Sequence, residues 1–122
     1  MPIRLILVLL GLVAAFGAGP ARAAESLGEG DRAAIRQVVE DQLDAFRRDD
    51  GAAAFGFASP FIQEKFGTPD NFMTMVRSGY GAVYRPRRVE FREIADDPDL
   101  GIVQKVLLVG PDGRPVLAIY QM

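Results

Sequence analysis

The pattern of apolar and polar positions changes once along the chain, from a helical repeat to the alternation typical of strands. From Asp31 to Phe46, apolar residues recur every three or four positions and form one stripe, which is interrupted at Gln42. This spacing predicts an amphipathic helix whose first turn is capped by the carboxylate of Asp31. The polar run at residues 49–51, which includes a glycine, is expected to end this helix.

Three short helices are predicted after the long one. Residues 52–58 are rich in alanine, which favours a helix of about two turns. Ser59-Pro60 and Thr68-Pro69 each place a capping side chain before a proline, which favours a helix start because proline has no N–H to leave unpaired. The two helices that follow are expected to end at Gly67 and near Gly79.

Three strands are predicted in the last part of the chain, over residues 88–94, 102–109 and 116–122. A turn at residues 110–113 separates the last two strands, so they are expected to form an antiparallel meander. Helices followed by such a meander predict an α+β fold, with the helices packed on one face of a curved sheet in a cone-like arrangement. The strand pattern is still running at Met122, so the last strand is expected to be a short edge strand or to belong to a truncated sheet.

Residues 1–23 have the pattern of a secretory signal peptide. Arg4 precedes an uncharged apolar stretch at residues 5–16, and small residues follow up to Ala21-Arg22-Ala23. Cleavage is therefore predicted between Ala23 and Ala24, since signal peptidase accepts small side chains before the cut. A membrane anchor is the alternative, but it needs about 20 apolar residues. The expected product is a polar lead-in at residues 24–30 and a single domain at 31–122, periplasmic or secreted, with no stable membrane anchor.

The composition removes several classes of function. The chain has no His, Cys or Trp, which excludes His-based proton shuttles, Cys nucleophiles, disulfides and His/Cys metal sites. Without Arg4 and Arg22 it has 12 basic and 16 acidic residues, a balance poorly suited to nucleic acid. The acidic run at residues 96–99 lacks the calcium-loop spacing and is expected to be a solvated turn. No cofactor, metal or nucleic acid is expected.

The segment from Tyr80 to Arg88 has the most site-like composition. Tyr80, Tyr84, Arg85 and Arg87 combine aromatic rings that carry hydroxyls with guanidinium groups that suit carboxylates or phosphates. One interpretation is an anion-binding site at the mouth of a pocket. The favoured interpretation is a corner between helix and strand, in which the arginines pair with carboxylates such as Glu90, Glu93 or an aspartate and the tyrosines pack in the core.

Aromatic and thioether side chains concentrate in the predicted short helices. Such side chains line apolar ligand cavities, but more often they simply fill a protein core. Both interpretations stay open for this set, which consists of Phe55, Phe57, Phe61, Phe66, Phe72, Met73 and Met75.

Residues 57–91 and 35–50 resemble domain of unknown function 4864, a family of small exported bacterial proteins. The motif from Ser78-Gly79-Tyr80 through Val83-Tyr84-Arg85-Pro86-Arg87 carries most of this resemblance. The order of elements is also similar to the nuclear transport factor 2-like (SnoaL-like) cone, in which a curved sheet surrounds a cavity. The family implies no activity and no functional residues. Its members continue into one more strand that carries a tryptophan, so the resemblance implies an open edge at the last strand here.

The sequence therefore predicts an exported domain, non-enzymatic rather than catalytic, that binds a small apolar or anionic ligand or a protein partner, a homodimer included. The first alternative is a small cofactor-free enzyme that uses carboxylate and tyrosine acid-base chemistry on a hydrophobic substrate. Its candidate residues are Glu40, Asp44, Tyr80 and Tyr84, although Asp44 is expected to pair with Arg48 on the solvated face of the long helix. A truncated, non-functional copy is the second alternative.

Overall fold

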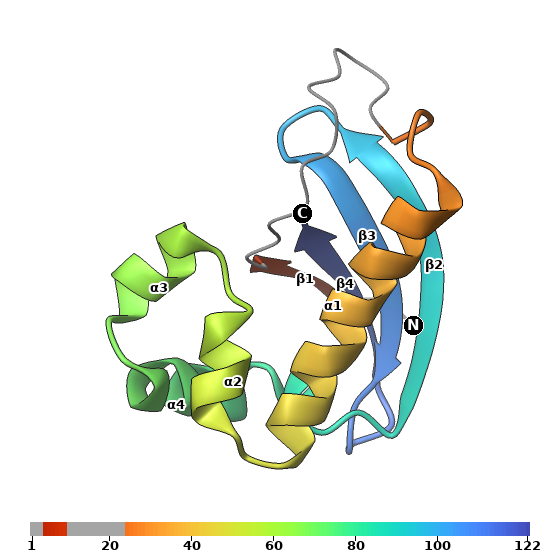
Figure 1. Ribbon diagram of the computed structural model, residues 1–122. Helices are drawn as coiled ribbons and strands as arrows, with labels where there is room; N and C mark the ends of the chain where they lie inside the picture. The colour runs from red at the N-terminus through yellow and green to blue at the C-terminus, as the bar shows by residue number, and fades with distance from the viewer. Residues whose placement is uncertain (1–3, 10–23) are drawn as a thin grey trace.

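The computed structural model describes residues 4–9 and 24–122, and this part of the chain is an α+β fold, as predicted (Figure 1). A long helix crosses one face of the sheet, and three shorter helices form a group beside its C-terminal end. The elements are β1 (Arg4–Leu9), α1 (Glu29–Arg47), α2 (Gly51–Gly56), α3 (Pro60–Phe66), α4 (Pro69–Gly79), α5 (Gly81–Tyr84), β2 (Arg88–Asp97), β3 (Gly101–Val109) and β4 (Pro115–Gln121).

The sheet has the strand order β1-β4-β3-β2. Strands β2, β3 and β4 form the predicted antiparallel meander, in which Arg88 pairs with Val109 and Val109 pairs with Pro115. Strand β1 lies parallel to β4 on its other side, so in the chain as described β4 is not an edge strand. β1 falls within the predicted signal peptide. The rest of that segment, including Ala23 on one side of the predicted cut, lies outside the described residues.

The start of α1 differs from the prediction. The helix begins at Glu29, and its N-cap is Gly28, an extended residue that supplies no side-chain cap. The prediction that Asp31 caps the helix is therefore wrong. Asp31 lies inside the first turn together with Glu29, where negative charge interacts favourably with the positive end of the helix dipole.

The boundaries of the short helices follow the sequence signals closely. Ser59 accepts a hydrogen bond from the Ile62 N–H at 3.3 Å, and Thr68 accepts one from the Asn71 N–H at 3.2 Å. Both caps stand before a proline at the first helical position, as predicted. The single turn α5 was not predicted, because four residues are too few to show a helical repeat.

The core lies between α1 and the sheet. Val39, Leu43 and Phe46 of α1 pack with buried residues of β3 and β4, among them Val106 and Tyr120. Gln42, which interrupts the apolar stripe of α1, is fully buried and donates a hydrogen bond to the Ala54 carbonyl at 3.1 Å. A buried amide needs such a partner, and this one joins α1 to α2.

Candidate functional site

An apolar pocket of about 400 Å³ opens in the helical part of the molecule. Most of its wall comes from α3 and α4, and α1 and the α4–α5 segment supply the remainder. A volume of this size is within the range of small-molecule sites, which are mostly apolar with a few polar groups. The lining residues are Phe46, Phe61, Ile62, Lys65, Phe66, Phe72, Met75, Val76, Tyr80 and Val83.

Phe72 of α4 is the structural centre of this wall. Its ring centroid lies 5.9 Å from that of Phe46, 5.4 Å from Phe55 and 6.0 Å from Phe66. These separations are typical of favourable aromatic pairs. Phe72 itself is buried, so the same ring stabilises the helical group and forms one side of the pocket.

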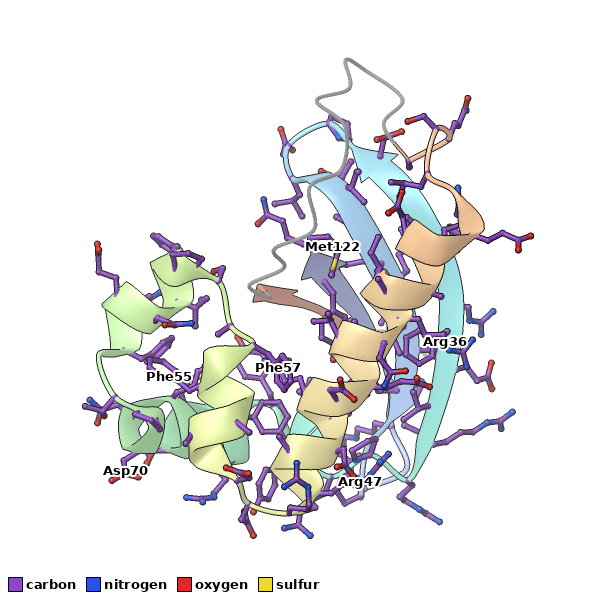
Figure 2. The ribbon with its side chains drawn as sticks, viewed as in Figure 1. Arg36, Arg47, Phe55, Phe57, Asp70 and Met122 are labelled. Atoms are coloured by element: carbon purple, nitrogen blue, oxygen red, sulfur yellow. The ribbon has the colours of Figure 1, made fainter. Side chains whose placement is uncertain are left out.

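The sequence left open whether the aromatic and thioether side chains line a cavity or fill the core, and the structure shows some of them in each place. Those at the pocket are Phe61, Phe66, Phe72 and Met75. Phe55 and Met73 instead pack with the core cluster. Figure 2 shows Phe55 on the side of α2 that faces α4, whereas Phe57 lies on the side that faces α1. The short helices therefore contribute both to the core and to the pocket.

Helix α3 forms the outer wall of the pocket and has no buried residue. Phe61 is 66% exposed, the one large hydrophobic residue among those described that is so accessible. Lys65 lies one turn further along α3, lines the pocket and makes no ion pair with any described residue; its ammonium lies 5.8 Å from the centre of the Phe66 ring. Lys65 was not among the site residues predicted from the sequence. The four-residue spacing of Phe61 and Lys65, which places both on one helix face, was the available signal.

Two of the four predicted site residues contact one carboxylate beside α5. The hydroxyl of Tyr84 donates a hydrogen bond to Asp49, and Nη2 of Arg85 lies 2.8 Å from the other Asp49 oxygen. Arg77 lies 3.6 Å from the same carboxylate. The hydrogen bond from Tyr84 and the neighbouring guanidinium groups lower the pKa of Asp49. These contacts match the corner interpretation, and a role for Tyr84 and Arg85 in ligand binding stays a prediction.

The other two predicted site residues lie in different surroundings. Tyr80 is half-buried and lines the apolar pocket. Arg87 is exposed and directly precedes β2, and its N–H donates to the Val109 carbonyl at 2.7 Å while its guanidinium approaches the turn at Gly113. The structure therefore divides Tyr80, Tyr84, Arg85 and Arg87 among three environments and does not gather them into one anion site.

The carboxylates of the enzymatic alternative lie in a shallow depression between α1 and β2. Asp44 is exposed to solvent there and Glu40 is half-buried, and both lie beside Arg36 and Arg47, which Figure 2 labels along α1. Glu40 lies 3.5 Å from Arg36, and Asp44 lies 2.9 Å from Arg48, as predicted for the latter pair. Arg36 also stacks on the ring of Phe91, with 4.3 Å to its centre. Neither carboxylate lines the apolar pocket that contains Tyr80.

The acidic run at residues 96–99 is only in part the expected turn, because β2 extends past the predicted residue 94 to Asp97 and the turn begins after it. Oδ1 of Asp97 accepts hydrogen bonds from the N–H groups of Asp99 and Leu100, at 2.8 and 3.0 Å. Among residues 4–9 and 24–122, no group of three acidic side chains is arranged to hold a metal ion. The same residues include no helix that is long and apolar enough to cross a membrane.

Comparison with known proteins identifies the family but no individual relative. Searches of curated proteins and of solved structures give no match. The profile of the family described as Domain of unknown function (DUF4864) matches residues 29–122, which include every described helix and the antiparallel strands. Since this match covers most of the sequence, the chain belongs to the DUF4864 family.

Proposed function

We propose that this protein is an exported binding protein that holds a small apolar ligand between α3 and α4. The observation that carries the proposal is the pocket of about 400 Å³ whose walls are formed mainly by phenylalanine, methionine and aliphatic side chains. An apolar ligand of matching size would transfer from water into contact with these walls. Burial of apolar surface makes the main favourable contribution to the free energy of such binding.

Binding is favoured over catalysis by the polar groups of this pocket. Lys65 and Tyr80 are the ionisable residues among those that line it, and neither an aspartate nor a glutamate is present in that lining. The enzymatic alternative combines a carboxylate with tyrosine, so it requires a carboxylate within hydrogen-bond reach of the substrate. Glu40 and Asp44, the candidates for that role, lie on another part of α1 and pair with arginines.

Export is proposed on the basis of the N-terminal sequence pattern, and cleavage at the predicted position would change the charge at Ala24. The backbone nitrogen of Ala24 lies 3.2 and 3.4 Å from the two carboxylate oxygens of Asp96. The Ala24 carbonyl accepts a hydrogen bond from Arg32 at 2.6 Å. Cleavage after Ala23 would convert this nitrogen to an ammonium group, and its hydrogen bond to Asp96 would become charge-assisted and stronger.

Native mass spectrometry of the protein released from the cell envelope tests both parts of the proposal. The expected result is a chain that begins at Ala24 and carries a retained small molecule, which organic extraction removes. A chain that keeps residues 1–23 would contradict export. A processed chain that carries no molecule, and that binds no hydrophobic probe in titration, would contradict the binding function.

A further inference from the structure

We propose that the ligand is a free single-chain amphiphile with one anionic headgroup, and that Lys65 binds this headgroup at the rim of the pocket. This inference rests on the proposed binding function and specifies its ligand class. Lys65 is the one charged residue among those that line the pocket.

Several cations of the described residues are paired with carboxylates and are therefore less available to bind an anion. Arg77 and Arg85 are paired with Asp49, Arg88 and Arg92 are paired with Glu90, and Lys105 is paired with Glu93. Lys65 has no such partner within the described part of the chain, although it lies beside an aromatic wall. An anion that reached the pocket would therefore meet an uncompensated ammonium group there.

The headgroup of such a ligand has to stay at the rim of the pocket. The deeper walls, formed by Phe46, Phe72, Val76 and Val83, are apolar and buried. Transfer of an ionised group into such surroundings is strongly unfavourable unless a partner compensates it. Lys65 is exposed, so its ammonium can bind the headgroup at the surface while the hydrocarbon chain occupies the interior.

The outer wall of the pocket offers the ligand a second contact, beside Lys65. Phe61 and Lys65 are four residues apart on α3 and line the same pocket. Phe61 is largely exposed in the structure, and a hydrocarbon chain in the pocket would supply the apolar surface that its ring lacks. The amphiphile would thus be held at two places on one helix, by the ring of Phe61 and by the ammonium of Lys65.

The absence of tryptophan from the sequence permits a specific fluorescence test. Phe61→Trp places the single tryptophan of the protein at the rim, and the probes are dodecanoate, dodecanol and dodecyltrimethylammonium below their micellar concentrations. Dodecanoate is expected to bind tightest and to shift the emission to shorter wavelength. Calorimetric titration of the unsubstituted protein with dodecanoate checks that the new tryptophan does not itself create the site.

Two charge-removing substitutions provide the comparison. Lys65→Met keeps an apolar stem but removes the ammonium, and it should weaken dodecanoate binding about fivefold, the effect of a partly exposed ion pair, while dodecanol binding stays unchanged. Arg114→Met removes another exposed cation that lies outside the pocket, and it should alter neither affinity. The effect of Lys65→Met should shrink as the salt concentration rises.

The outcomes separate this inference from the proposed function. If dodecanol binds as tightly as dodecanoate, and Lys65→Met changes nothing, the apolar site stands and the headgroup assignment is overturned. If none of the three probes binds, the proposed function itself fails. The protein is also sedimented with phosphatidylglycerol vesicles. If it cosediments with them and Lys65→Met abolishes this cosedimentation, the headgroup belongs to a membrane lipid and the claim of a free amphiphile is overturned. Protein that stays in the supernatant supports a free amphiphile.

Discussion

The hydroxyl of Tyr84 donates a hydrogen bond to the carboxylate of Asp49, a residue 35 positions earlier in the chain. Asp49 follows Arg48, the C-cap of α1, and has a left-handed backbone conformation, with φ of 55°. The bond joins the end of α1 to α5, and Arg85 and Arg77 add two guanidinium groups to the same carboxylate. This cluster stabilises the corner next to Tyr80 and Val83, two residues that line the pocket.

The first prediction concerns the charge of Asp49. Asp49→Asn should lower the thermal midpoint of unfolding by a few degrees at pH 7, because the substitution removes the ion pairs with Arg77 and Arg85. Asparagine tolerates the left-handed conformation, so the backbone should not be strained. The folded state lowers the pKa of Asp49, so its stabilising effect is present above the pKa of the unfolded chain. That effect is lost as the pH falls through the lower, folded pKa.

Thermal unfolding followed by circular dichroism at several pH values between 7 and 2 measures this difference. The gap between the parent protein and Asp49→Asn should narrow toward the acidic end. A gap that stays constant over the whole range would mean that the charge of Asp49 contributes nothing to stability.

The second prediction concerns the buried hydroxyl of Tyr120. Tyr120 is fully buried in the core, and its hydroxyl has no hydrogen-bond partner within the described residues. Burial raises the pKa of this hydroxyl, so the group stays protonated. It therefore keeps an O–H donor for which no described residue supplies an acceptor. Tyr120→Phe should leave the free energy of unfolding unchanged or raise it by up to about 1 kcal/mol.

Urea unfolding measures this change, and Tyr84→Phe is the matched control. The control loses a hydrogen bond that the structure contains, so it should be less stable than the parent. A clear loss of stability in Tyr120→Phe would show that its hydroxyl has a partner in solution.

The third prediction concerns the close packing of Gly51 against α4. A Cβ atom added at Gly51 would lie 2.9 Å from Cγ of Met73, which is itself buried. Gly51→Ala should therefore lower the free energy of unfolding by about 1–3 kcal/mol through overpacking. Gly56→Ala, at the other end of α2, meets no atom within 4 Å and should not be destabilising. Equal effects of the two substitutions in urea unfolding would disprove the close contact.

The fourth prediction tests occupation of the pocket. Met75 is half-buried on α4 and lines the pocket, so Met75→Trp should fill part of the space and weaken dodecanoate binding more than tenfold, an effect of about 1.4 kcal/mol or more. Thr74→Trp adds the same ring at the neighbouring exposed position and should leave binding unchanged. Calorimetric titration compares the two variants. Similar affinities would place the ligand outside this pocket.

Much of the local structure could be predicted from the sequence because its causes are local. Ser59-Pro60 and Thr68-Pro69 contain both the capping side chain and the proline that begin α3 and α4. The alternation of Val89 and Phe91 with charged residues similarly indicates a strand with one buried face. The start of α1 was predicted two residues late, since a glycine cap carries no side-chain signal.

The candidate site depended on tertiary structure. Tyr84 and Arg85 are residue types that suit an anion site. The packing of α1 against α5 brings Asp49 close to them, and its carboxylate already binds the Tyr84 hydroxyl and the Arg85 guanidinium. No sequence motif includes Lys65. It is a candidate binding residue because α3 and α4 form an apolar pocket beside it. The sequence thus determined which segments are helices and strands and the α+β class, since spacing and caps act within a few residues. Only the folded chain decided which charges are compensated and which are free, because compensation depends on partners that lie far away in sequence.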